Sequence, residues 1–244
     1  MFLIDPREGA SGDMILGALI ASSGVPLREM EELLSSSGSV MGETVVRLRR
    51  VEERGVEALE VDVRWEEGEG DIEALKMKAH LLDALQAAGL SRENRFAREA
   101  FERIVRAEEE VHNEPLAYLK LHETGTPDTL VDIVGVAFLR EKLELEGEWV
   151  EALPPGVGRG AVVIAHGVYP VPAPATRIIM RGLPYTEGPW EGELLTPTGA
   201  TLLKGLVDIW RREGEAPEGL KLLGAGVGSR SFAGRRSLLK IYGG

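Results

Sequence analysis

Two segments with strand periodicity meet at a tight turn and are flanked by segments with helical periodicity. This combination constrains the fold more than any other feature. Residues 44–50 and 58–65 alternate apolar and polar side chains on either side of residues 53–55, which predicts a β-hairpin. Residues 14–23 carry an apolar helical pattern that ends at Gly24. We therefore expect an α+β fold with mixed sheets packed with helices, and ferredoxin-like units are one option.

The rest of the pattern divides the chain at an acidic, glycine-rich stretch, residues 66–70. We predict a first region over 1–65, in which a strand, a loop and a helix precede the hairpin, and a second region over 71–244. The two regions can also pack as one domain. The expected helices are 26–35, 71–88, 91–111, 126–143 and 196–212, and the expected strands are 2–4, 116–121, 150–169, 220–228 and 237–242.

Composition argues against several classes of partner. A formal net charge of −12 would repel a phosphate backbone, so we expect no nucleic acid partner. The chain has no cysteine, which leaves His, Asp and Glu as its strong metal ligands. No apolar run approaches the roughly 20 residues of a membrane helix. We therefore expect no membrane association and a cytoplasmic location, with a symmetric homo-oligomer as the default state.

The most informative segment for function runs from His122 to Asp132. Thr126 and the proline after it predict a helix start, which places Asp128 and Asp132 on one helical face. His122 and Glu123 lie in the loop before it, so these four side chains are candidate metal ligands. Asp132 stands in an otherwise apolar run, where a carboxylate costs free energy unless it is paired or bound to a cation. The structural alternative is that Asp128 caps the helix and Asp132 forms an ion pair.

A second candidate site is the loop that leads into the first helix. Ser11, Gly12 and Asp13 place backbone N–H groups at a helix N-terminus, which suits a phosphate. The carboxylate of Asp13 would repel that phosphate unless a cation lies between them. Asp5, at the end of the first strand, could share this cation. The alternative is an ordinary helix start in which Ser11 or Asp13 is the N-cap.

Two threonines and one histidine complete the candidate residues. Thr196 and Thr198 open a later helix and are either contacts for the same anion or simple helix caps. His80 falls within a helix, and His112 ends one, where the helix dipole already favours it. His166 lies between a strand and a proline-rich run, so no dipole explains it. Imidazole beside carboxylates is a normal nickel or manganese site.

The chain carries no P-loop, dinucleotide-binding fingerprint or nucleophile elbow. Its own motifs extend from one end to the other. They include Ser11-Gly12-Asp13-Met14, His122-Glu123-Thr124-Gly125, Asp128-Thr129-Leu130-Val131-Asp132, His166-Gly167-Val168-Tyr169-Pro170-Val171-Pro172-Ala173-Pro174-Ala175-Thr176, Thr196-Pro197-Thr198-Gly199-Ala200 and Gly224-Ala225-Gly226-Val227-Gly228. In order and spacing these resemble the N-terminal half of the nickel insertion proteins of nickel-pincer cofactor synthesis, which mature lactate racemase.

This resemblance implies an activity and a role for each candidate residue. The activity is insertion of nickel into pyridinium-3,5-bisthiocarboxylic acid mononucleotide, with CTP and a divalent ion such as manganese or magnesium. A nickel–carbon bond in the product requires loss of a ring proton, and Asp132, Glu123 and His166 are the candidate bases. The candidate metal ligands are His122, Glu123, Asp128, Asp132, His166 and Asp5. The candidate nucleotide contacts are Ser11, Gly12, Asp13, Thr196 and Thr198.

The chain also departs from the family pattern. Residues 66–70 stand where many members have a His-rich insertion, and Lys120 replaces a histidine two positions before His122. Typical members continue into a further domain, so a separate C-terminal-domain subunit is a candidate partner. Two other functions remain open: a non-catalytic nickel carrier or assembly partner, and a metal-dependent nucleotide or phosphate-ester enzyme.

Overall fold

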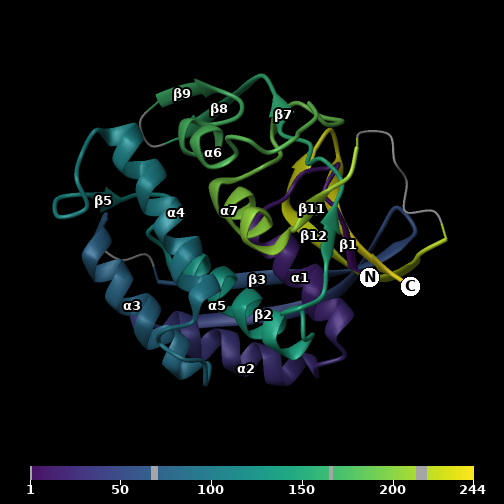
Figure 1. Ribbon diagram of the computed structural model, residues 1–244, viewed down its shortest axis with the longest axis horizontal. Helices are drawn as coiled ribbons and strands as arrows, with labels where there is room; N and C mark the ends of the chain where they lie inside the picture. The colour runs from purple at the N-terminus through teal and green to yellow at the C-terminus, as the bar shows by residue number, and fades with distance from the viewer. Residues whose placement is uncertain (1, 67–70, 165–166, 213–218) are drawn as a thin grey trace.

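The computed structural model describes residues 2–66, 71–164, 167–212 and 219–244 (Figure 1). Its centre is a mixed sheet of seven strands. These are β1 (Phe2–Asp5), β2 (Thr44–Glu53), β3 (Val56–Trp65), β6 (Val150–Ala152), β11 (Ile209–Trp210), β12 (Lys221–Phe232) and β13 (Arg235–Gly243). They lie in the order β11-β6-β1-β13-β12-β3-β2. The predicted α+β fold with mixed sheets is confirmed.

The hairpin predicted over residues 44–65 forms one edge of this sheet. β2 and β3 pair antiparallel along their whole length. Arg54 and Gly55, with φ of 52° and 75°, make the two-residue turn whose twist suits paired strands. β3 meets β12 in parallel at Gly226↔Leu59. The described residues form no further pair between these two strands, so the sheet opens toward the carboxyl ends of both.

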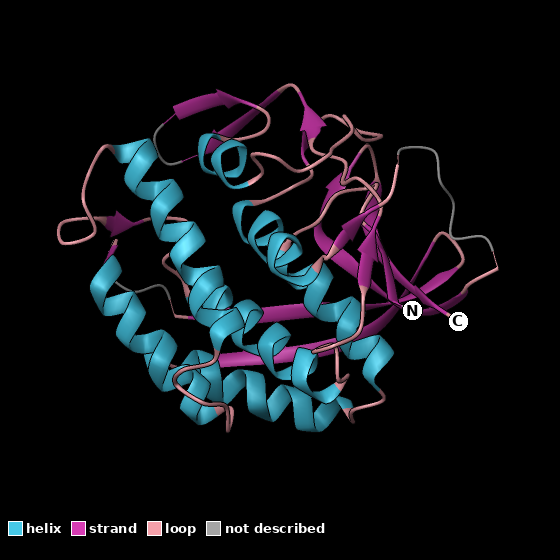
Figure 2. Cartoon of the chain, viewed as in Figure 1, coloured by secondary structure: helices cyan, strands magenta, loops and turns pink. Residues whose placement is uncertain are grey.

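Helices lie against this sheet (Figure 2). They are α1 (Gly12–Ser23), α2 (Leu27–Gly38), α3 (Ala74–Ala87), α4 (Arg95–His112), α5 (Pro127–Lys142), α6 (Pro174–Ile179) and α7 (Pro197–Leu206), with a 3-10 turn at Ser39–Met41. Three small sheets pair β4 (Ile72–Glu73) with β5 (Lys120–Leu121), β7 (Gly158–Arg159) with β10 (Gly192–Glu193), and β8 (Ala161–Ile164) with β9 (Gly167–Pro170). α1 packs on β3 and β12, α2 packs on β2, and both helices contact α5.

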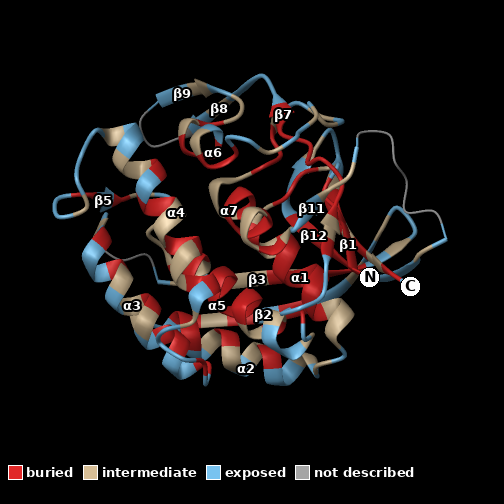
Figure 3. Ribbon diagram, viewed as in Figure 1, coloured by how far each residue is buried: buried red, intermediate tan, exposed pale blue. Residues whose placement is uncertain are grey.

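α5 lies in the interior of the molecule (Figure 3). Every residue from 130 to 137 is buried. Gly135 permits this packing, because a Cβ there would lie 2.7 Å from side-chain atoms of both Leu16 and Leu34. One apolar core cluster includes Leu16 and Leu34 from before residues 66–70 and Leu139 from after them. Strands from both sides of residues 66–70 also pair in the central sheet.

The glycine-rich motif near the C-terminus has a packing role. A Cβ at Gly226 would lie 1.9 Å from the backbone oxygen of Met14 and 2.7 Å from the backbone nitrogen of Ala18. Because both contacts are to backbone atoms of α1, no side-chain rotation can relieve them. Glycine at this position therefore lets α1 lie directly against β12, and α1 is the helix whose N-terminus reaches the site described below.

The helix expected over 196–212 is shorter than predicted. α7 ends at Leu206, and Val207 adopts extended backbone with φ −90° and ψ 123°. The N–H of Asp208 then donates to the carbonyl of Val150 (2.9 Å), which starts β11 beside β6. Pairing with the sheet edge therefore replaces the last two turns of the expected helix.

One further expectation is corrected. The strand expected over 116–121 is reduced to β5, because the N–H groups of Tyr118 and Leu119 both donate to the carbonyl of Pro115 and form a turn. Within the described ranges, no helix is long and apolar enough to cross a membrane.

Candidate functional site

A cavity of about 370 Å³ lies where β3 and β12 part. Its walls come from the carboxyl ends of these two strands and from the N-terminal turns of α1, α5 and α7. Carboxyl ends of parallel strands are a common place for ligand sites in sheets of this kind. We name it the carboxylate cavity after its charged walls, which carry Asp13, Asp62, Glu123, Asp128, Asp132, Glu193 and Arg230.

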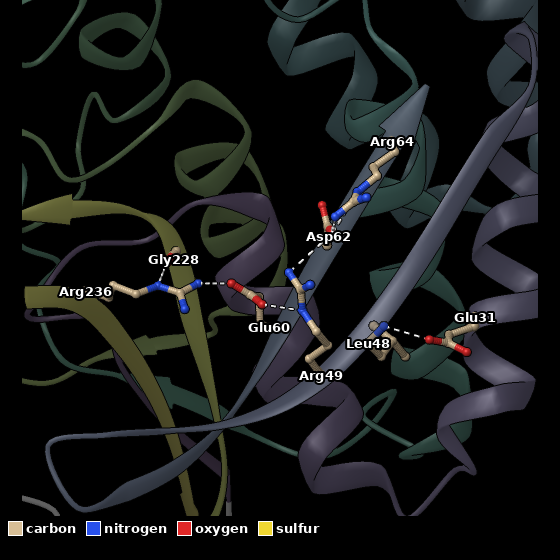
Figure 4. Close-up of polar contacts among 8 residues, drawn as sticks. All are labelled: Glu31, Leu48, Arg49, Glu60, Asp62, Arg64, Gly228 and Arg236. Carbon is tan, nitrogen blue, oxygen red and sulfur yellow. Dashed lines mark hydrogen bonds and ion pairs between the residues drawn. The ribbon is translucent and has the colours of Figure 1, made fainter. Parts of the chain in front are cut away.

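Polar contacts across the opening hold the strands in place (Figure 4). Arg236 of β13 donates to the carbonyl of Gly228 in β12 (2.7 Å) and to Glu60 in β3. Arg49 of β2 donates to Glu60 (2.8 Å) and to Asp62 (3.3 Å). Gly228 and Asp62 line the cavity. Side-chain hydrogen bonds from Arg49 and Arg236 therefore hold β3 and β12 in place on either side of the opening.

Three helix N-termini converge on the cavity. The N-cap residues Ser11, Thr126 and Thr196 of α1, α5 and α7 all have extended backbone. The starts of α1 and α7 are joined, because Ala10 donates its N–H to the carbonyl of Leu194 (2.9 Å) and accepts from the N–H of Thr196 (3.1 Å). Each helix contributes the positive end of its dipole, so the cavity can hold an anion.

Glycine at position 12 allows the closest approach in the site. A Cβ on Gly12 would lie 1.8 Å from Oδ2 of Asp132 and 2.4 Å from its Cγ. The start of α1 and the second turn of α5 are therefore in direct contact. This contact brings together two segments that are 120 positions apart in the sequence, and it places Asp132 beside the first turn of α1.

The carboxyl groups of Asp13 and Asp128 have local partners. Asp13 accepts from the hydroxyl of Ser11 and from the N–H of Met14 (2.9 Å), and Asp128 accepts from the hydroxyl of Thr126. Burial raises the pKa of both groups. The Ser11 and Thr126 hydroxyls thus donate to carboxylates instead of capping the helices, while Thr196 is a true cap whose Oγ1 accepts from the N–H of residue 199 (3.1 Å).

Asp132 differs from both of these residues. Its side chain is buried, with 6% of the residue exposed, and within the described part of the chain its Oδ1 has no hydrogen-bond partner. Burial raises its pKa well above the usual range, and the nearby charges of Asp128 and Asp13 add to the effect. The ion pair that the structural alternative required for Asp132 is absent from the described residues. A buried carboxyl oxygen without a partner is the kind of group that a bound cation satisfies.

Glu193 is a cavity residue that the sequence did not single out. β10 holds its backbone opposite Gly158 of β7. Its side chain is buried, its Oε1 has no hydrogen-bond partner among the described residues, and its Oε2 lies 3.8 Å from Nη1 of Arg230. Burial raises the pKa of Glu193 to about 7, although Arg230 opposes the shift. The sequence signal for a buried acid at this position was its place next to the apolar pair 194–195. This signal is weaker than that at Asp132, which stands within a longer apolar run.

A second cavity, of about 320 Å³, adjoins the first and shares Glu123, Thr124 and Pro197 with it. Its remaining polar lining includes His112 and His122, whose ring centroids are 5.3 Å apart. We name it the imidazole cavity. It lies between the C-terminal end of α4, the loop before α5 and the start of α6.

The two histidines of the imidazole cavity have carboxylate neighbours. Nε2 of His112 lies 3.4 Å from Oε2 of Glu108, one helical turn earlier on α4. Oε1 of Glu108 accepts from the hydroxyl of Thr124 (3.1 Å), and burial raises the pKa of Glu108. Nδ1 of His122 contacts Oδ1 of Asp71. His112 was not among the predicted site residues because the helix dipole already explained its position, although its i, i+4 spacing from Glu108 was a usable signal.

The structure divides the predicted site residues into groups. The carboxylate cavity is lined by Ser11, Gly12, Asp13, Glu123, Asp128, Asp132, Thr196 and Thr198. The imidazole cavity is lined by His122 and, again, Glu123. Asp5 lines neither cavity; it accepts two hydrogen bonds from the Arg7 side chain, at 2.8 and 2.7 Å, and one from the Arg7 backbone N–H, at 3.3 Å. His166 lies outside the described residues. No group of three or more His, Asp or Glu side chains in the described ranges is already placed to hold a metal ion.

Comparison with known proteins identifies relatives along the whole chain. The family model described as nickel insertion protein matches residues 2–243. A relative from Methanothermobacter thermautotrophicus, named for nickel insertion, is 39% identical over 93% of this chain and 55% of its own length. A relative from Geobacillus kaustophilus is 33% identical over 98% of this chain and 58% of its own length. It is named pyridinium-3,5-bisthiocarboxylic acid mononucleotide nickel insertion protein.

A third relative, from Methanopyrus kandleri, is 38% identical over 97% of this chain and 58% of its own length, and its name also assigns it to nickel insertion. The chain therefore spans a little over half the length of these relatives. No solved structure matches the chain.

Proposed function

This chain belongs to the nickel insertion protein family, and from that membership we propose that it takes part in inserting nickel into pyridinium-3,5-bisthiocarboxylic acid mononucleotide. The name of the Geobacillus relative supplies the substrate class. The observation that locates the proposed site is Asp132, which lines the carboxylate cavity and whose buried Oδ1 has no hydrogen-bond partner among the described residues. Nickel is a substrate of this reaction, and so is the mononucleotide.

The carboxylate cavity suits the phosphate of a mononucleotide or of CTP when a divalent cation accompanies it. The starts of α1, α5 and α7 attract the phosphate, and the carboxylates of Asp13, Asp128 and Asp132 repel it. A magnesium or manganese ion between them reverses that repulsion. These ions commonly use one or two protein carboxylates and take their other ligands from phosphate and water. The absence of a ready group of three ligands among the described residues fits this kind of site.

The reaction also needs a group that accepts the ring proton when nickel takes its place on carbon. Asp132 and Glu193 are suited to this role because both are buried in the cavity wall with raised pKa values. A base works best when its pKa lies near the working pH, and the value of about 7 favours Glu193. Glu123, the other described candidate, is exposed at the boundary between the cavities.

The test is an insertion assay with the purified chain, the mononucleotide, CTP, Mn²⁺ and Ni²⁺, read by mass spectrometry for a product with the isotope pattern of nickel. We expect product from the wild type and from Asp83→Asn, an exposed control on α3. We expect Asp132→Asn to lose about tenfold or more of the activity.

Two results would contradict the proposal. One is the absence of product both from the chain alone and from the chain supplemented with the remaining part of a longer relative, even if the chain binds nickel; a nickel carrier would then be the better description. The other is nucleotide hydrolysis that proceeds equally well without nickel and gives no metallated product, which would indicate a phosphate-ester enzyme.

A further inference from the structure

We propose that the end of β12 forms the subsite for the ring of the mononucleotide. Phe232 packs against the positively charged pyridinium ring, and Arg230 binds an acid group attached to that ring. The inference deepens the proposed function and rests on it for the identity of the ligand. The subsite itself rests on the side chains that this strand end presents to the carboxylate cavity.

β12 leads along the cavity wall from the start of α1 to this strand end. Gly228 lies against the first turn of α1, because a Cβ there would be 3.1 Å from Sδ of Met14. Residues two apart on a strand point to the same face and are roughly 6.6 Å apart. Gly228, Arg230 and Phe232 all line the cavity. A mononucleotide whose phosphate lies at the helix starts can therefore place its ring, on the other side of the ribose, beside Arg230 and Phe232.

The ring of Phe232 is held in place by a stack of side chains. It lies parallel to the ring of Trp190, with an interplanar angle of 4° and 6.2 Å between centroids, which is an offset stack. The guanidinium of Arg54, in the turn between β2 and β3, lies 5.5 Å from the centroid of the Trp190 ring. Arg54 is itself held by Glu8, to which its Nη1 donates at 2.9 Å. Because Phe232 also lines the cavity, this stack presents an ordered aromatic ring to a ligand.

The charge beside Phe232 favours a ring that is positively charged. Gly192 lies against Phe232, since a Cβ there would be 2.9 Å from Cε1 of the ring, and the next residue is Glu193. An aromatic face attracts cations, and a neighbouring carboxylate strengthens that preference. The pyridinium in the name of the Geobacillus relative is such a ring, whereas the cytosine of CTP is uncharged. The same arrangement places Glu193, the base favoured above, next to the ring whose proton it would accept.

Arg230 supplies the opposite charge for the acid groups on the ring. Its side chain is 66% exposed, and its Nη1 lies 3.8 Å from Oε2 of Glu193, which is longer than a hydrogen bond. A guanidinium carries five N–H donors in a planar fork that matches a carboxylate. This loose ion pair therefore leaves Arg230 able to bind a second acid. Arg230 and Phe232 together select a ring that is cationic and bears an anionic substituent.

The test measures binding of nicotinic acid mononucleotide, a pyridinium mononucleotide with one ring carboxylate. Binding to the full chain is followed by calorimetry in the presence of Mg²⁺ and without nickel. Phe232→Leu should weaken binding by about tenfold, and Phe232→Tyr, which keeps an aromatic ring, by less than about threefold. Arg230→Gln should weaken binding by about tenfold. Arg235→Gln is the matched control and should leave binding unchanged, because Arg235 is an exposed arginine of the same hairpin outside the cavity lining.

Two further ligands separate the roles of the two residues. Nicotinamide mononucleotide has an amide in place of the carboxylate, so Arg230→Gln should weaken its binding by less than about twofold, while Phe232→Leu still weakens it by about tenfold. The reduced form of nicotinamide mononucleotide has an uncharged ring and should bind the wild type roughly tenfold more weakly than the oxidised form.

A spectroscopic readout separates loss of contact from misfolding. In nuclear magnetic resonance spectra, contact with the aromatic ring of Phe232 should shift the ring protons of bound nicotinic acid mononucleotide upfield. Phe232→Tyr should keep that shift and Phe232→Leu should remove it, with an unfolding temperature close to that of the Arg235→Gln control.

Four results would overturn the inference. They are no saturable binding of nicotinic acid mononucleotide by the wild type, binding that survives both Phe232→Leu and Arg230→Gln, an Arg230→Gln effect that is equal for the acid and the amide, and displacement of the probe by an equal concentration of CTP. Failure of the proposed function is distinguishable from these. A chain that binds the pyridinium probes as stated but gives no metallated product would contradict the proposed function alone.

Discussion

Replacing Asp132 by Asn should make the metal-free protein more stable. The wild type keeps a buried carboxyl oxygen that has no hydrogen-bond partner among the described residues, and two further carboxylates lie nearby. A buried polar group left unsatisfied costs about 1–3 kcal/mol, and a charged one costs more. The amide of Asn has almost the same shape and no charge. We therefore expect Asp132→Asn to raise the free energy of unfolding at neutral pH by about 1–3 kcal/mol.

For a chain of 244 residues, each kcal/mol corresponds to roughly 2–4 °C in the unfolding temperature. The expected gain is therefore about 2–12 °C, measured by circular dichroism in the presence of a chelator. Asp83→Asn is the control, because the Asp83 side chain is 55% exposed and its replacement should change stability by less than about 0.5 kcal/mol.

The dependence of this gain on pH follows from the raised pKa of Asp132. Between the unfolded value of 3.8 and the higher folded value, the folded chain binds more protons than the unfolded chain. The wild type therefore loses stability as pH rises through this window, and Asp132→Asn does not. The gain should be close to zero near pH 4 and largest where Asp132 is ionised. A variant that is less stable than the wild type at neutral pH, or a gain that does not change with pH, would refute the reasoning.

Three further predictions concern other parts of the site. Glu193→Gln should gain stability over the wild type as pH rises from 4.5 through about 7, reaching up to about 3 kcal/mol above pH 8 in urea unfolding; a constant difference would argue against a raised pKa. Gly226→Ala should cost about 1–3 kcal/mol or more, since its Cβ meets backbone of α1. Gly228→Ala should cost less, because its Cβ meets a flexible methionine side chain at 3.1 Å; equal costs would contradict the packing account. Thr196→Ala should lose about 1 kcal/mol through its cap hydrogen bond, whereas Thr198→Ala should lose less in the same unfolding assay.

Local patterns were sufficient to predict the elements that carry the site. The start of α5 at Pro127 and the end of α1 before Gly24 follow from proline and glycine at helix ends. The hairpin follows from alternation around a turn. The face shared by Asp128 and Asp132 follows from helical spacing alone. These are features in which neighbours in sequence are also neighbours in space.

The remaining parts of the site depend on contacts between distant segments. The hydrogen bonds between residue 10 and residues 194 and 196 bring α7 beside α1, and no local sequence pattern predicts these bonds. The opening between β3 and β12 depends on where parallel pairing stops. His122 was grouped with Asp132 because both lie near one helix start, but the direction of a loop side chain is not fixed by spacing. The structure places His122 in the imidazole cavity, with His112 and Glu108.

The central claim is that this chain handles nickel on its way to the mononucleotide. The most direct measurement is an isotope chase. The chain is loaded with ⁶³Ni, freed of unbound metal, and mixed with the mononucleotide, CTP, Mn²⁺ and an excess of unlabelled Ni²⁺, with the remaining part of a longer relative supplied if the chain alone gives no product. The account predicts that the first product formed carries the label from the protein. Product that contains only unlabelled nickel, or label that stays on the protein while product forms, would contradict it.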